Sequence, residues 1–230
     1  MGVLANRRRR PAAAARREAD PRVKRSRAAV IAAARALFLE HGYAGTTMEE
    51  IAAAAGLTKR TLYNNYADKD ALFSEIVAEV MAYAEAFAAG LREEFAAGVS
   101  GATLDAWLHD VGRRLALGIL RPDVIALRRL IIAEAKSMPS LGARYFDRVP
   151  GQVLDAIASG FAQMHRRGLL RVPDGRLAAA QFAYLIVGEP LDRALMTGVL
   201  PRTPLVVAAA REGVETFLLR YRGVSGRRRR

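Results

Sequence analysis

The sequence has no cysteine, and this absence excludes disulfide bonds and metal sites built on thiolates. Its three histidines, His41, His109 and His165, lie too far apart in the chain to form a metal-ligand motif. No apolar stretch reaches the roughly 18 residues that a transmembrane helix needs. The Arg-rich start lacks the apolar segment of a signal peptide. We therefore expect a soluble cytoplasmic protein with no cofactor, no metal site and no membrane partner.

Aromatic residues are scarce at 7%, although 52% of the chain is hydrophobic, because much of the apolar content is alanine. Alanine has the highest helix propensity, so this composition favours helices over strands. The sequence also lacks a nucleophile with its base, a paired carboxylate motif and a glycine-rich phosphate loop. These absences predict that the protein is not an enzyme and has no catalytic residues.

Positive charge is in excess, with a net charge of +13, and it is concentrated at the two ends. Residues 1–27 contain ten Lys or Arg and two acidic residues, and residues 227–230 are all Arg. Runs of like charge are usually solvated and disordered, and we interpret residues 1–21 and 223–230 in this way. Such segments are also attracted to polyanions, so the sequence leaves open whether these tails contact DNA.

Periodic apolar residues interrupted by Gly and Pro predict a succession of helices and no sheet. Val30, Ala34 and Phe38 mark one face of the first helix, which Gly42 would end. The expected helices cover about 22–41, two short segments within 47–66, 69–97, 103–118, 122–137, one or two segments within 140–168 broken near 150–151, 174–197 with a kink at 188–190, and 203–222.

The segment 47–66 reads as two short helices joined by a tight turn, the arrangement that presents a helix to the DNA major groove. Thr47 and Thr58 are good N-cap residues for the two helices, and Glu50 completes a capping box with Thr47. Gly56 stands where a chain leaving a helix often needs positive φ. Leu62 would pin the second helix against the first.

On that second helix, Arg60, Thr61, Tyr63 and Asn64 point away from Leu62, and Lys59 stands at its start. Arg can bind guanine, Asn can bind adenine, and a Thr methyl can contact thymine. Phosphates are the expected partners of Tyr63, Asn65 and Lys69, and of the free N–H groups that follow Thr47. The alternative is an amphipathic helix with a merely hydrated polar face. Tyr66 is expected to pack in the core.

Residues 24 to about 84 resemble the DNA-binding domain of the tetracycline-repressor-like (TetR/AcrR) transcriptional regulators. The matching segments, in order, are 31–38 (Ile-Ala-Ala-Ala-Arg-Ala-Leu-Phe), 41–43 (His-Gly-Tyr), 46–47 (Thr-Thr), 51–52 (Ile-Ala), 55–58 (Ala-Gly-Leu-Thr), 61–63 (Thr-Leu-Tyr) and 68–73 (Asp-Lys-Asp-Ala-Leu-Phe). The resemblance implies DNA-facing or cap positions for Thr47, Thr58, Lys59, Arg60, Thr61, Tyr63, Asn64, Asn65 and Lys69.

The resemblance also implies an all-α fold, with an N-terminal three-helix helix-turn-helix domain and a C-terminal helical domain for ligand binding and dimerisation. The expected boundaries are 1–21 for the basic arm, 22–84 for the DNA-binding domain, 85–222 for the effector-binding and dimerisation domain, and 223–230 for the basic tail. In relatives the last two helices, here 174–197 and 203–222, form the homodimer interface. Candidate pocket residues are Trp107, Val111, Phe161, Met164, His165 and Tyr184, and the alternative for each is ordinary core packing.

The resulting hypothesis is a ligand-responsive DNA-binding regulator, acting as a repressor, that binds a palindromic double-stranded operator as a homodimer. Its effector would be a small molecule that the sequence does not identify. The competing hypothesis is an architectural DNA-binding protein without an effector, whose binding would be driven by the tails and would be independent of sequence.

Overall fold

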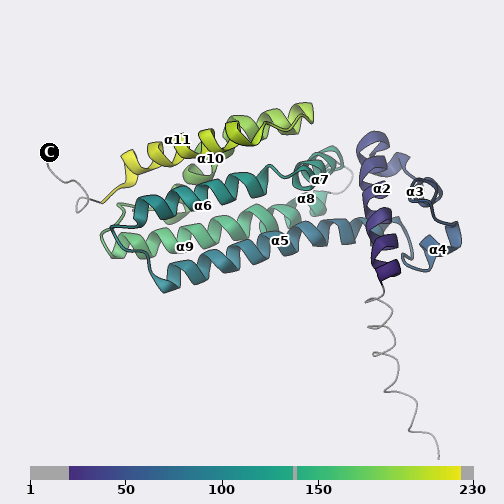
Figure 1. Ribbon diagram of the computed structural model, residues 1–230, viewed down its shortest axis with the longest axis horizontal. Helices are drawn as coiled ribbons and strands as arrows, with labels where there is room; N and C mark the ends of the chain where they lie inside the picture. The colour runs from purple at the N-terminus through teal and green to yellow at the C-terminus, as the bar shows by residue number, and fades with distance from the viewer. Residues whose placement is uncertain (1–20, 137–138, 224–230) are drawn as a thin grey trace, which may run out of the picture. The chain divides into compact units, whose positions relative to one another are not determined.

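The computed structural model describes residues 21–136 and 139–223, and within them every regular element is helical (Figure 1). One isolated antiparallel β-bridge, between Leu170 and Arg222, is the exception. The all-α prediction is therefore confirmed. The predicted basic arm and basic tail lie outside the described residues, apart from Pro21 and Gly223.

The elements follow one another closely, and their order is α2 (Pro21–Gly45), α3 (Met48–Ala54), α4 (Lys59–Tyr63), α5 (Lys69–Ala97), α6 (Leu104–Ile119), α7 (Pro122–Ala133), α8 (Pro139–Phe146), the π-helical turn η1 (Asp147–Gly151), α9 (Gln152–Arg166), α10 (Gly175–Thr197) and α11 (Thr203–Tyr221). No helix in the described ranges combines the length and apolar character needed to cross a membrane. The chain divides into two compact units at Ile76, inside α5, whereas the sequence placed the domain boundary at residue 84.

Two expectations about local structure differ from what is observed. The predicted helix 122–137 ends as α7 at Ala133, where Glu134 leaves helical geometry. The predicted break near 150–151 is instead the turn η1, which joins α8 to α9. Pro150 has no backbone N–H, so it cannot complete an α-helical hydrogen bond, and a wider turn absorbs it without ending the helical path.

The first unit contains α2, α3, α4 and the beginning of α5. Val30, Ala34 and Phe38 are buried, as the periodicity of the first helix predicted. The ring of Phe38 packs edge-on against that of Phe73, with 5.8 Å between centroids. Gly42 has φ 73°, so the α-helical part of α2 ends there and the chain can turn towards α3.

In the second unit, α10 packs against α9 and α11, and α11 packs against α6 (Figure 1). Three mutually contacting rings, those of Phe161, Phe182 and Phe217, lie where α9, α10 and α11 meet, with centroids 5.0–5.4 Å apart. Gly213 lets α11 approach α10 closely, since a Cβ there would lie 2.5 Å from the carbonyl oxygen of Leu185. The last two helices therefore form a tightly packed pair.

Candidate functional site

Helix α3 begins with a capping box, as the sequence predicted. Thr47 Oγ1 accepts a hydrogen bond from the backbone N–H of Glu50 at 3.2 Å. The Glu50 carboxylate in turn accepts one from the backbone N–H of Thr47 at 2.8 Å. The two bonds satisfy donors that a helix N-terminus leaves without intrahelical partners, and they fix where α3 starts.

The turn between α3 and α4 is a Schellman motif centred on Gly56, which has φ +67°. The backbone N–H of Leu57 bonds the carbonyl oxygen of Ala52 at 2.9 Å, and that of Gly56 bonds Ala53 at 3.1 Å. The left-handed conformation at Gly56 therefore sets the direction in which α4 leaves α3.

Helix α4 turns one side inward and leaves the other open. Leu62 is 0% exposed and Tyr66, just past the helix, is 4% exposed, so both belong to the core as predicted. Arg60, Tyr63 and Asn64 are exposed. The side chains that could reach base edges thus lie on the side of α4 opposite its buried anchor.

Polar side chains also complete the two ends of α4. Thr58 is its N-cap and accepts from the backbone N–H of Thr61 at 3.2 Å, while the two hydroxyls lie 2.8 Å apart. At the other end, Asn65 Nδ2 donates to the carbonyl oxygen of Thr61 at 3.0 Å. Three of the predicted DNA-facing residues therefore have structural roles within α4 and its caps.

Lys59 forms an ion pair with Glu49 of α3. The hydrogen bond from Lys59 lowers the pKa of Glu49, and the same bond raises the pKa of Lys59. The side chains of Lys59 and Glu49 are 63% and 50% exposed, so the pair lies at the surface. The ammonium group at the start of α4 is thus partly neutralised before any DNA is present.

Lys69, at the start of α5, is half-buried. Its ammonium group donates to the carbonyl oxygens of Tyr43 at 2.6 Å and Thr46 at 2.8 Å, and it lies 4.4 Å from the centroid of the Tyr43 ring. This residue ties α5 to the end of α2. Contact between Lys69 and a phosphate stays a prediction.

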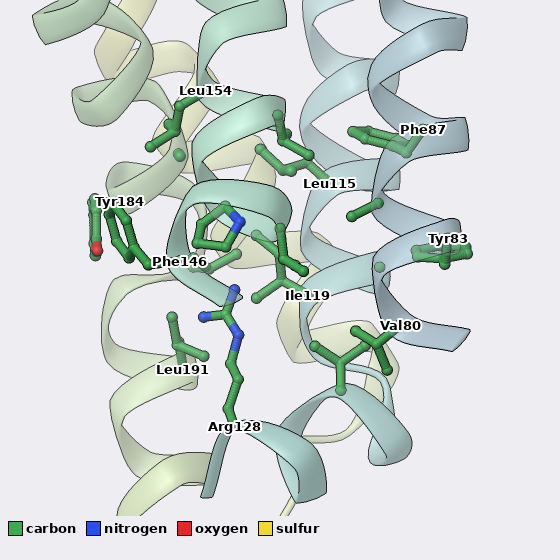
Figure 2. Close-up of a pocket in the computed structure, with 18 of the residues that line it drawn as sticks. Val80, Tyr83, Phe87, Leu115, Ile119, Arg128, Phe146, Leu154, Tyr184 and Leu191 are labelled. Carbon is green, nitrogen blue, oxygen red and sulfur yellow. The ribbon is translucent and has the colours of Figure 1, made fainter. Parts of the chain in front are cut away.

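The second unit contains a partly open cavity of about 260 Å³ between α5, α6, α7, α8, η1, α9 and α10. Figure 2 shows apolar side chains converging on it from several helices, among them Phe87, Leu115, Leu154 and Leu191. Concave apolar sites with a few polar groups are typical of small-molecule binding. The polar groups here include the guanidinium groups of three arginines.

The three arginines, Arg114, Arg128 and Arg176, differ in their partners. The guanidinium of Arg114 binds both carboxylate oxygens of Glu94, at 2.9 and 2.8 Å. Arg176 forms an ion pair with Asp155. No ion pair of Arg128 with another described residue is found, and its Nε is buried without a hydrogen-bond partner.

Of the six pocket residues suggested by the sequence, Tyr184 lines this cavity and the other five do not. Trp107 packs against Phe95 with 4.8 Å between ring centroids, and its Nε1 donates to Glu94 at 3.0 Å. His165 is exposed, and its Nδ1 lies 3.3 Å from both the Leu170 carbonyl oxygen and the Val172 backbone nitrogen. The remaining three are buried in the packed core, namely Val111, Phe161 and Met164.

Sequence reasoning missed most of the lining because small residues create the space. Gly118, Ala180 and Ala183 line the cavity without filling it. Arg128 was not among the residues suggested by the sequence, because its helix also carries Asp123 and Arg129 and nothing local marks one of these charges as facing a cavity.

Apolar side chains are exposed along α10 and α11, where the sequence expected an interface. The most exposed of them are Leu177, Tyr184, Leu185, Met196, Leu205 and Leu219. A groove between the two helices is lined by Tyr184, Leu185, Pro190 and Leu205, among others. Tyr184, which is 61% exposed, lines both this groove and the cavity.

Comparison with protein families gives two matches that together cover most of the described chain. The family of bacterial regulatory proteins called tetR matches residues 30–76. The C-terminal domain of AefR-like transcriptional repressors matches residues 106–223. The first match spans the capped helices α3 and α4, and the second spans most of the cavity lining and all of α10 and α11.

Individual relatives agree with these matches. A TetR-family transcriptional regulator from Mesorhizobium loti is 32% identical, and its structure superposes with a TM-score of 0.71 over 89% of this chain and 100% of its own. The flavonoid-responsive regulator FrrA is 27% identical, with a TM-score of 0.57 over 86% and 98% of the two chains. An HTH-type transcriptional regulator of Bacillus subtilis, YezE, is 27% identical over 62% of this chain and 72% of its own length.

Proposed function

Since the chain belongs to the TetR family of transcriptional regulators, we propose that it is a ligand-responsive repressor that binds a palindromic operator as a homodimer. DNA binding and transcription regulation come with the family. The ligand response, the repressor role, the palindrome and the homodimer are the proposal.

The observation that carries the proposal is the exposure of Arg60 and Asn64 around the fully buried Leu62. A guanidinium can bind guanine through two hydrogen bonds, and an Asn amide can do the same with adenine. Lys59 and Tyr63 supply phosphate contacts, which fix the register without reading the sequence. A further phosphate is proposed at the N-terminus of α3, on the backbone N–H groups that the Thr47–Glu50 capping box does not use.

The outer side of α10 and α11 supports a homodimer. Its exposed residues include Leu185, Leu205 and Leu219, and the last is 90% exposed. Apolar patches of this kind usually mark an interaction surface. A second copy of the chain is the proposed occupant, because a two-fold axis lets the same patch pack against itself. That axis would also relate the two copies of α4, so the operator is expected to be a palindrome.

The cavity supports a small-molecule effector, and the flavonoid-responsive relative FrrA shows that a similar chain can respond to one. To release DNA, the effector must bind the DNA-incompetent state much more tightly than the DNA-bound state. A protein that releases its operator DNA when the effector binds would act as a repressor whose effector induces transcription. The same role implies a cytoplasmic location, where a bacterial chromosome lies.

The test is a gel shift with the intergenic DNA beside the gene that encodes the chain. We expect binding to this fragment to be at least tenfold tighter than to a scrambled fragment of the same composition. Equal affinity for both fragments would contradict the proposal and support an architectural DNA-binding protein. Sedimentation velocity on the free protein tests the dimer, which a concentration-independent monomer would rule out.

A further inference from the structure

We propose that the ligand of the cavity is an organic anion, with one negatively charged acceptor group bound by Arg128 and an apolar body that fills the remaining space. This inference rests on the proposed function, which assigns the cavity to the effector. It goes further by naming the chemical class of the effector and the residue that selects it.

Arg128 reaches into the cavity from α7. Figure 2 shows its guanidinium directed towards the middle of the space, between apolar side chains that include Leu191 and Ile119. Its Nε is buried and has no hydrogen-bond acceptor among the described residues. A buried N–H of a charged group that lacks an acceptor is unfavourable, because the group has lost its water and gained nothing in return. A ligand oxygen would supply the missing acceptor.

The other charges around the cavity are already balanced. Arg114 is bound by Glu94, and Arg176 is paired with Asp155. No Asp or Glu is found among the described residues that line the cavity. The uncompensated charge facing the ligand is therefore positive, which favours an anion and disfavours a cation.

The polar neighbours of Arg128 do not replace that anion. Burial raises the pKa of the neighbouring Tyr145 hydroxyl, against the effects of the Arg128 charge and of a side-chain hydrogen bond with Arg128, so this hydroxyl is a neutral partner at physiological pH and leaves the charge of Arg128 uncompensated. Asp123 is held by Arg121 through two hydrogen bonds of 3.0 and 2.8 Å. Neither residue lines the cavity.

The remaining lining of the cavity favours a ligand whose uncharged part is apolar. Aromatic rings come from Tyr83, Phe87, Phe146 and Tyr184, and aliphatic side chains occupy most of the remaining wall (Figure 2). A volume of about 260 Å³ is slightly below the range of about 300–1,000 Å³ that is common for drug-sized ligands. The ligand is thus a compact amphiphile rather than a sugar or a large polar metabolite.

A pair of fluorescent probes separates charge from shape. Anilinonaphthalenesulfonate and phenylnaphthylamine share the same ring system, and the first carries a sulfonate that the second lacks. Both become bright on entering an apolar site. We expect the wild-type full-length chain to bind the sulfonate with one site per protomer, and about tenfold or more tightly than the neutral probe.

Substitution of Arg128 should affect one probe and not the other. In Arg128→Met the affinity for the sulfonate should fall by about tenfold or more, with less than about a twofold change for the neutral probe. Arg128→Lys keeps the charge but lacks the planar guanidinium group. Its affinity for the sulfonate should lie between those of the wild type and Arg128→Met. Arg129→Met is the matched control, since it removes the same charge from the next position of α7, where the side chain is exposed and does not line the cavity.

A second variant locates the bound probe. Ala180→Phe should weaken both probes together, because Ala180 is half-buried and lines the cavity. Circular dichroism melting of each variant identifies any that fails to fold. If neither probe responds to Ala180→Phe in a folded variant, the probes bind elsewhere and the assignment of the cavity is wrong.

Two results would overturn the anion proposal. One is equal affinity of the wild type for the two probes, and the other is an equal loss for Arg128→Met and Arg129→Met. Neither result bears on DNA recognition, which the gel shift measures without a probe. Conversely, a wild-type chain that fails to discriminate its operator, yet prefers the sulfonate through Arg128, would contradict the proposed repressor function and leave the anion site supported.

Discussion

The ammonium group of Lys59 lies against the carboxylate of Glu49, so the first cation of α4 is paired across the α3–α4 turn. Any phosphate that approaches Lys59 has to compete with this carboxylate. In Glu49→Gln we expect binding to the operator fragment to tighten by up to about fivefold at low salt, the range expected for exposed ion pairs. Fluorescence anisotropy over a series of salt concentrations measures the effect.

The control for this change is Glu93→Gln, which removes one negative charge from an exposed position of α5 in the other unit. If the two variants behave alike, the gain reflects overall charge and not the release of Lys59. Weaker binding by Glu49→Gln would mean that the pair positions Lys59 for DNA instead of competing for it.

Arg60→Ala tests direct reading of bases by the exposed side of α4. We expect a loss of about 1–3 kcal/mol in operator binding and relaxed preference at one base position of each half-site, since a bidentate contact with guanine would be removed. Binding to a library of single-base operator variants measures both effects. Lys59→Ala is the comparison, and it should weaken binding to all sequences equally. Uniform weakening by Arg60→Ala would contradict its role as a reader.

Gly56 and Gly90 offer a matched pair for backbone strain, because a Cβ added at either position would meet no atom within 4 Å. Gly56 has positive φ, and Ala there should destabilise the first unit by about 1–2 kcal/mol. Gly90 lies inside α5, and Ala there should stabilise the protein by about 0.8–1.0 kcal/mol. Urea unfolding monitored by hydrogen exchange in each unit would measure both changes. Effects of the same sign would contradict the assigned turn geometry.

Tyr66 is expected to make stability depend on alkaline pH. Burial is the main cause that raises its pKa to about 12, and its hydroxyl donates to Glu75 at 3.2 Å. The unfolded side chain ionises near pH 10, about two units earlier. The contribution of the neutral hydroxyl is therefore complete below about pH 10 and is lost as the pH rises from about 10 to 12.

Tyr66→Phe should remove this dependence, so the difference in unfolding free energy between wild type and variant should shrink over that pH interval. Urea unfolding at several pH values provides the measurement. Tyr63→Phe, at the exposed tyrosine of α4, is the control. Parallel stability curves for the wild type and Tyr66→Phe would show that this hydroxyl does not ionise differently on unfolding.

Local features of the first unit could be predicted because short-range chemistry determines them. A Thr followed three residues later by Glu defines the cap at Thr47, and a Gly before the second helix defines the turn at Gly56. The burial of Leu62 followed from helical periodicity alone. Each of these features depends on residues within a few positions of one another.

The cavity could not be predicted in the same way, because it depends on how distant helices meet. Phe161 was a pocket candidate with core packing as its alternative, and it is buried in the core. The open space arises where small residues such as Ala180 and Ala183 face other helices. The sequence predicts a break near Pro150 where the structure has a turn, since sequence does not distinguish an interrupted helix from one that widens by a residue.

The Tyr184 side chain lines both the inner cavity and the outer groove of α10 and α11. A substitution at this position that is selected for its effect on the cavity therefore also alters the groove. If the groove receives a second copy, duplicated genes that diverge in inducer preference through position 184 should also lose the ability to form mixed dimers. The two duplicated regulators would then stop forming mixed dimers as a by-product of the change in their ligand preference.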